Sequence, residues 1–63
     1  MRKTYYFSFM QSSPLKDYYF AAEDMTYEEA RNEMVKHFGD KWAFQYDTLE
    51  ALGAEIFNLK RIN

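Results

Sequence analysis

The chain contains no cysteine, one histidine, two glycines and one proline among its 63 residues. Without cysteine, disulfides and thiolate zinc sites cannot form, and His37 alone cannot build a histidine-rich metal site. Gly39 and Gly53 stand far apart, which excludes a glycine-rich loop around a phosphate. No apolar run approaches the roughly 18 residues of a membrane-spanning helix, so we expect no membrane contact.

An excess of charge of one sign is absent as well. The formal net charge is −2 and the pI is near 5.2, which argues against a general affinity for nucleic-acid backbones. The apolar part of the N-terminal MRKTYYFSFM is too short and too rich in tyrosine for a signal sequence. We therefore expect a cytoplasmic protein.

Aromatic residues, in contrast, are abundant: six Tyr, six Phe and one Trp make up 21% of the chain. A chain of this length can form one small domain, residues 1–63, which hides only about 60% of its unfolded surface. Since disulfides and a metal are excluded, we expect dense aromatic packing, oligomerisation or both to stabilise the fold.

Two strands are predicted in the first third of the chain. Residues 4–11 and 16–23 are rich in aromatic residues and alternate as extended chains do. Residues 12–14, Ser-Ser-Pro, break the first run because proline lacks the amide that a β-ladder needs. The short connection favours an antiparallel hairpin.

A helix is predicted over residues 26–38. Thr26 and Glu29 have the spacing of a capping box, in which each side chain satisfies a free backbone amide of the first turn. Gly39 is placed to end the helix with a positive φ. An apolar stripe at helical spacing is formed by Tyr27, Ala30, Met34, Val35 and Phe38.

Three shorter elements are predicted after the helix. The segment WAFQY is a strand whose Trp42, Phe44 and Tyr46 share one face. A single helical turn over residues 48–52 and a strand over 54–62 follow, and the short connection after Tyr46 favours a hairpin. This order predicts a two-layer α+β domain of the ββαββ type, with one helix packed on a mostly antiparallel sheet of about four strands.

The strand periodicity divides the aromatic and aliphatic side chains between two faces of that sheet. The face under the helix is expected to hold Tyr5, Phe7, Phe9, Tyr18, Phe20, Trp42, Phe44, Tyr46, Phe57 and Leu59. The opposite face has no long helix to cover it, and an uncovered apolar patch is typical of an interface. The candidate interface residues on that face are Tyr6, Met10, Tyr19, Ile56 and Ile62. A homodimer or a docked protein partner would account for them.

No arrangement of residues in the sequence is typical of a catalytic site, and we predict no catalytic, cofactor-binding or metal-binding residue. Ser12 and Ser13 lack a neighbouring base, and His37 stands in the last turn of the helix, where it suits a capping or surface role. The acids around the helix start have capping spacing and favour a solvated face over a metal site, a protein-binding patch or a mimic of DNA phosphates.

Single-stranded nucleic-acid binding is the alternative function. Tyr6 and Tyr19 could stack bases if a basic groove followed the backbone. The basic residues are scattered, although the pairs at 2–3 and 60–61 would converge if the first and last strands were neighbours. The net charge disfavours this alternative.

Glu28-Glu29-Ala30-Arg31, Phe38-Gly39 and the segment WAFQY, with the upstream SSPLKDYYF, form a pattern over about two-thirds of the chain. In this pattern the chain resembles small uncharacterised proteins encoded by phages and prophages of Gram-positive bacteria. The resemblance implies a bacterial cytoplasm and an accessory phage gene, and proteins of that kind often bind and block a host or defence protein. We therefore expect a non-enzymatic protein that acts by protein–protein interaction.

Overall fold

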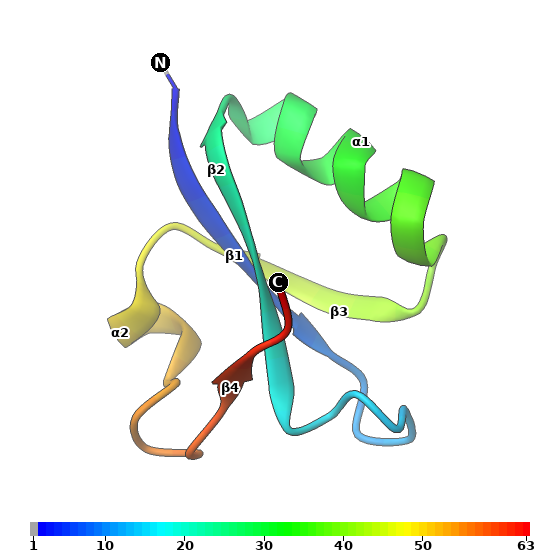
Figure 1. Ribbon diagram of the computed structural model, residues 1–63, viewed down its shortest axis with the longest axis vertical. Helices are drawn as coiled ribbons and strands as arrows, with labels where there is room; N and C mark the ends of the chain where they lie inside the picture. Colours follow the sequence, from blue (N-terminus) through cyan, green and yellow to red (C-terminus); the bar gives the residue numbers. More distant parts are fainter. Residues whose placement is uncertain (1) are drawn as a thin grey trace.

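The computed structural model describes residues 2–63, so only Met1 of the expected domain lies outside the described residues. It confirms the α+β class, with one main helix packed on a four-stranded sheet (Figure 1). The elements in chain order are β1 (Lys3–Phe9), β2 (Tyr18–Met25), α1 (Tyr27–Phe38), β3 (Trp42–Tyr46), α2 (Leu49–Leu52) and β4 (Lys60–Arg61).

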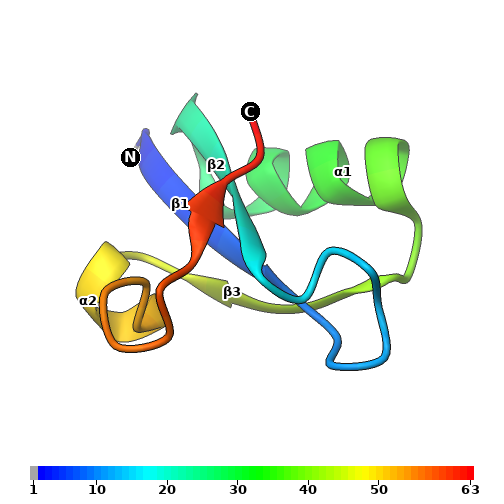
Figure 2. The ribbon, with the colours of Figure 1, turned by 60° about the horizontal axis from the view of Figure 1, so that its bottom comes forward.

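The sheet has the strand order β3-β1-β2-β4. β1 pairs antiparallel with β2 and with β3, whereas β4 runs parallel to β2, so the sheet is mixed. α1 lies across one face, and α2 with the loop after it lies at the opposite face (Figure 2). The predicted hairpin between the first two strands is present, with Phe7 opposite Phe20 and Tyr6 opposite Ala21.

The core lies between α1 and the two central strands. Phe7, Phe9, Ala22, Ala30 and Met34 are buried there. The ring of Phe7 meets that of Trp42 edge to face at 5.2 Å, and Phe9 meets Phe38 at 5.0 Å. Edge-to-face contacts of this kind add to the stabilisation that comes from area burial alone. Ala30 is fully buried, and its small side chain lets the helix approach the sheet closely.

The capping box at the start of α1 is confirmed. The Thr26 hydroxyl accepts from the Glu29 amide at 3.2 Å, and the Glu29 carboxylate accepts from the Thr26 amide at 2.9 Å. Gly39, at a φ of +63°, ends the helix by donating its amide to the Val35 carbonyl. The predicted apolar stripe is too wide, because the Tyr27 and Val35 side chains are 51% and 58% exposed. Neither side chain belongs to the core cluster under the helix.

The predicted strand over residues 54–62 is wrong in all but two residues, Lys60 and Arg61. Positive φ angles at Gly53 (79°) and Asn58 (54°) turn the intervening chain instead of extending it. The predicted hairpin between the last two strands is also wrong, since the loop carries the chain across the sheet to the far edge of β2. There the Asn63 carboxamide accepts from the Ala21 amide at 3.1 Å and donates to its carbonyl at 2.8 Å, as a neighbouring strand would.

The predicted faces of β3 need a correction as well. Phe7 lies opposite Gln45, but Phe9 lies opposite Trp42, so the register shifts and β3 holds one residue more than β1 over this stretch. Trp42 therefore packs in the core, while Phe44 is 65% exposed and Tyr46 lies opposite Tyr6 on the other face. In total, five residues expected under the helix lie outside the core cluster. Phe44, Tyr46, Phe57 and Leu59 lie away from α1, and Tyr18 stands at the exposed start of β2.

Candidate protein-interaction surface

We call the side of the sheet opposite α1 the open face. Its apolar and aromatic side chains are Tyr6, Met10, Tyr19, Phe44, Tyr46, Phe57 and Leu59. The Tyr6 and Tyr19 rings meet edge to face, with their centroids 6.0 Å apart. Leu52 of α2 is buried, so the short helix covers part of this face and leaves the rest accessible.

A groove of about 570 Å³ crosses the open face between the β1–β3 pair and the loop after α2. Met10, Phe44 and Phe57 line it, and their side chains are 45%, 65% and 69% exposed. The charged residues that line it are Lys16 and Asp17. Exposed aromatic side chains grouped around one groove are typical of a protein-interaction surface, whereas isolated exposed apolar residues are not.

A second hollow, of about 840 Å³, lies beside the first over α2 and the following turn. Leu59 lines both hollows, which makes the apolar surface continuous from Met10 to this turn. Leu49 and Ile56 extend the surface and are 41% and 82% exposed.

The structure places the five predicted interface residues differently from one another. Tyr6 and Tyr19 lie on the open face but are half-buried, and each packs against the other. Met10 and Ile56 are exposed at its two ends, each in a different hollow. Ile62 is half-buried at the edge of β2, where its amide donates to the Tyr19 carbonyl at 2.8 Å.

The two most exposed aromatic residues of the surface, Phe44 and Phe57, were missed by reasoning from the sequence. Strict alternation along β3 places Phe44 under the helix, and nothing in the segment WAFQY signals the register shift that turns it away. Phe57 stands between Gly53 and Asn58, two residue types that favour turns, and this signal could have removed it from a predicted strand.

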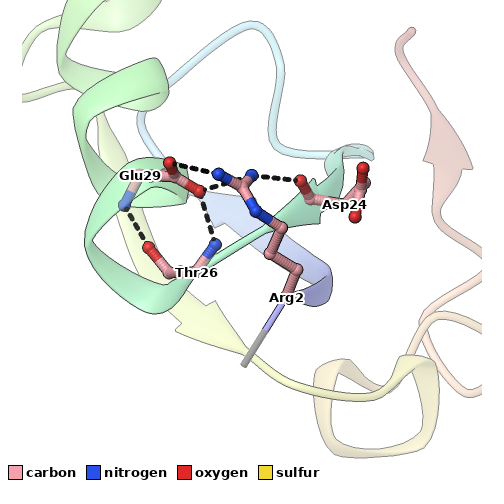
Figure 3. Close-up of polar contacts among 4 residues, drawn as sticks. All are labelled: Arg2, Asp24, Thr26 and Glu29. Carbon is pink, nitrogen blue, oxygen red and sulfur yellow. Dashed lines mark hydrogen bonds and ion pairs between the residues drawn. The ribbon is translucent and has the colours of Figure 1, made fainter.

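One arginine near each chain end is paired with an acid. The Arg2 guanidinium binds the Glu29 carboxylate at 2.8 Å and the Asp24 carbonyl at 3.0 Å (Figure 3). Arg61 binds the Glu23 carboxylate at 2.8 Å. β2 separates β1 from β4, so the first and last strands are not neighbours and the condition for the basic pairs at 2–3 and 60–61 to converge is not met.

These contacts shift two pKa values. The pKa of Glu29 is lowered below its ordinary 4.5, first by the hydrogen bond from the Thr26 amide and then by the charge of Arg2. The pKa of Arg61 is raised by its hydrogen bond to Glu23. Glu29 thus works as a cap and an ion-pair partner at the helix start.

Arg31 lies between α1 and β3. Its guanidinium donates to the Tyr27 hydroxyl at 2.9 Å and to the Gln45 side chain at 3.2 Å, and stacks 4.9 Å from the ring centroid of Trp42. Among residues 2–63 no carboxylate forms an ion pair with Arg31. Arg31 therefore joins the helix to the sheet edge through aromatic and amide contacts.

Within residues 2–63, no three His, Cys, Asp or Glu side chains gather in a way that could hold a metal ion. The two helices that the structure describes are too short and too polar to cross a membrane. The open face with its groove is the candidate functional site. Compared with known proteins, the chain matches no family model, no curated protein and no solved structure.

Proposed function

We propose that this chain is a small, non-enzymatic binding protein that contacts another protein through the open face. The observation that carries the proposal is the groove lined by Phe44 and Phe57. Both phenyl rings are mostly exposed, whereas a protein with so small a core would be expected to bury them. Aromatic side chains are enriched among the residues that contribute most to protein–protein binding. The groove would receive one or two apolar side chains of the partner.

A protein partner suits the open face better than a single-stranded nucleic acid does. Nucleic-acid binding needs unpaired cations beside the stacking rings, and Arg2 and Arg61 are already bound to carboxylates. The two tyrosines of the expected stacking platform are half-buried and pack against each other, so only part of each ring is accessible to a base.

The setting we propose is a bacterial cytoplasm in which the chain serves as a phage accessory protein. The support is the resemblance carried by Glu28-Glu29-Ala30-Arg31, Phe38-Gly39 and WAFQY. In that setting the partner is a host or defence protein whose activity the chain blocks by occupying an apolar surface.

An affinity capture from bacterial lysate tests this proposal. Tagged wild-type protein is compared with Phe44→Ser/Phe57→Ser and with Val35→Ser, which alters a side chain 58% exposed on the outer flank of α1. We expect a protein, retained after nuclease treatment, to bind the wild type and Val35→Ser but not the double variant. A protein that binds all three equally would contradict the use of the open face. Capture of nucleic acid that is lost on nuclease treatment would favour the alternative function.

A further inference from the structure

The charges on the open face are distributed unevenly between its two hollows. In the groove between the β1–β3 pair and the loop after α2, Lys16 and Asp17 carry opposite charges. In the second hollow, over α2 and the following turn, the charged lining residues are Glu50 and Glu55, and both are exposed. The excess of charge that lines the two hollows is therefore negative and lies in the second one.

The two carboxylates of the second hollow are not neutralised by the rest of the fold. Among residues 2–63, no lysine, arginine or histidine forms an ion pair with Glu50 or Glu55. Arg61 pairs in the sheet with Tyr19, which lines the same hollow, but its guanidinium is bound to Glu23 at 2.8 Å. The negative charge of the hollow is thus available to a binding partner.

Exposed apolar side chains lie beside these carboxylates. Leu49 precedes Glu50 and Ile56 follows Glu55, and all four residues line the second hollow. The Ile56 side chain, 82% exposed, is the most exposed large apolar side chain of residues 2–63. Leu59 lines both hollows and joins them into one elongated surface. A ligand of this surface would cover apolar area along it and supply positive charge at the end over α2.

From this we infer that the open face receives a segment of a partner protein in which lysine or arginine stands beside an apolar residue. The apolar residue enters the groove with Phe44 and Phe57, and the basic residue reaches Glu50 and Glu55. Complementary charges across an interface speed the encounter and fix the orientation of the partner. The inference rests on the proposed function and adds to it the chemistry of the partner.

The other two occupants fit the charge of the second hollow less well. A nucleic acid would bring phosphates to Glu50 and Glu55. A second copy that meets the chain through the same face would bring two further carboxylates into the interface. Both add negative charge where the surface already has an excess, whereas a basic segment removes it.

Selection from a library of random peptides tests the inference with defined ligands. Immobilised wild type is compared with Glu50→Gln/Glu55→Gln. The matched control is Glu28→Gln/Asp40→Asn, which removes two exposed carboxylates that line neither hollow. We expect wild type and the control to enrich peptides with lysine or arginine beside an apolar residue, and the variant of the hollow to lose this preference. Enriched peptides without an excess of basic residues, or the same preference in all three proteins, would overturn the inference.

The dissociation constant of one enriched peptide measures the size of the effect. Fluorescence anisotropy of the labelled peptide is expected to give a Kd roughly three- to tenfold higher for Glu50→Gln/Glu55→Gln than for wild type or the control. The difference should shrink at about 1 M salt, which screens exposed charges. Equal Kd values for the three proteins would contradict a basic partner. Circular dichroism of each variant checks that α1 is retained.

Phe44→Ser/Phe57→Ser separates this inference from the proposed function. If the serine variant no longer binds the enriched peptide but Glu50→Gln/Glu55→Gln binds it as wild type does, the open face is the binding surface and the basic partner is wrong. If wild type enriches no peptides beyond those of the serine variant, the open face itself is contradicted, and the inference with it.

Discussion

At the scale of single residues, Thr26 decides where α1 begins, because its hydroxyl satisfies an amide that no helical carbonyl can reach. Thr26→Ala is expected to lower the free energy of unfolding by about 1 kcal/mol, the usual effect of losing such a cap. Urea unfolding followed by circular dichroism measures the change. Thr26→Ser keeps the hydroxyl and should remain close to wild type, and an equal loss in both variants would contradict the capping role.

Glu29 makes the stability of the helix start depend on pH. Its pKa is lower in the folded chain than in the unfolded one, so its carboxylate stabilises the fold above about pH 4.5 and less so as the pH falls through the folded pKa. Glu29→Gln keeps the capping hydrogen bond but removes the charge that Arg2 binds.

We therefore expect Glu29→Gln to unfold at a lower temperature than wild type at pH 7, and the two midpoints to converge as the pH falls below the folded pKa of Glu29, where the wild-type carboxyl is protonated. Thermal unfolding across this range checks the prediction. A difference in midpoint that does not change with pH would show that the charge of Glu29 contributes nothing.

At the scale of elements, one methionine does most to hold α1 on the sheet. Met34 is fully buried against the β1–β2 pair, so Met34→Ala is expected to lower the free energy of unfolding by about 2–5 kcal/mol. Val35→Ala, one residue further on, removes an exposed side chain and should stay within about 0.5 kcal/mol of wild type. Denaturant unfolding of the pair measures the two effects. Similar losses would mean that the helix is packed on a different face.

β4 depends on a side chain that imitates a strand. The Asn63 carboxamide makes two hydrogen bonds to the backbone of Ala21, and Asn63→Leu removes both. We expect faster hydrogen exchange at the Ala21 amide in this variant, with no change at Phe7 in the central strand. Asn63→Asp keeps an acceptor for that amide and should give an intermediate rate. Unchanged exchange in both variants would show that the carboxamide does not protect the edge.

The elements that local signals encode were predicted correctly. Thr26 and Glu29 mark the start of α1 and Gly39 marks its end. Pro14 interrupts the extended run, so that the residues before and after it form the two strands of the β1–β2 hairpin. The face of Phe44 and the partner of β4 depend on contacts between distant segments. A register shift of one residue turns a side chain to the other face of a strand, and no residue of WAFQY announces it. The sequence therefore predicted an uncovered apolar face but misplaced its two most exposed aromatic residues, Phe44 and Phe57.

At the scale of the whole molecule, the open face has a structural part and an accessible part. Tyr6 and Tyr19 pack against each other and are half-buried, whereas Phe44 and Phe57 are mostly exposed. A domain of this size has a total stability of only about 3–9 kcal/mol. Tyr6→Ser/Tyr19→Ser is therefore expected to lower the unfolding midpoint strongly, because buried aromatic area and an edge-to-face contact are lost together.

The matched double variant Phe44→Ser/Phe57→Ser is expected to keep a midpoint near that of wild type at low concentration, where association contributes little. Thermal unfolding of both double variants at two protein concentrations separates the two roles. If the phenylalanine variant melts as early as the tyrosine variant, the groove belongs to the core and not to an interface.

The contact between Asn63 and Ala21 spans 42 residues, whereas the hairpin of β1 and β2 and the helix that follows it form within short stretches of chain. Long loops close slowly compared with local contacts, and closing them adds little stabilising free energy until the rest of the sheet is in place. We expect β4 to join the sheet as the last step of folding. Until then the outer side of β2 is unpaired, so the newly made chain is most easily captured by another strand in the moment before it is complete.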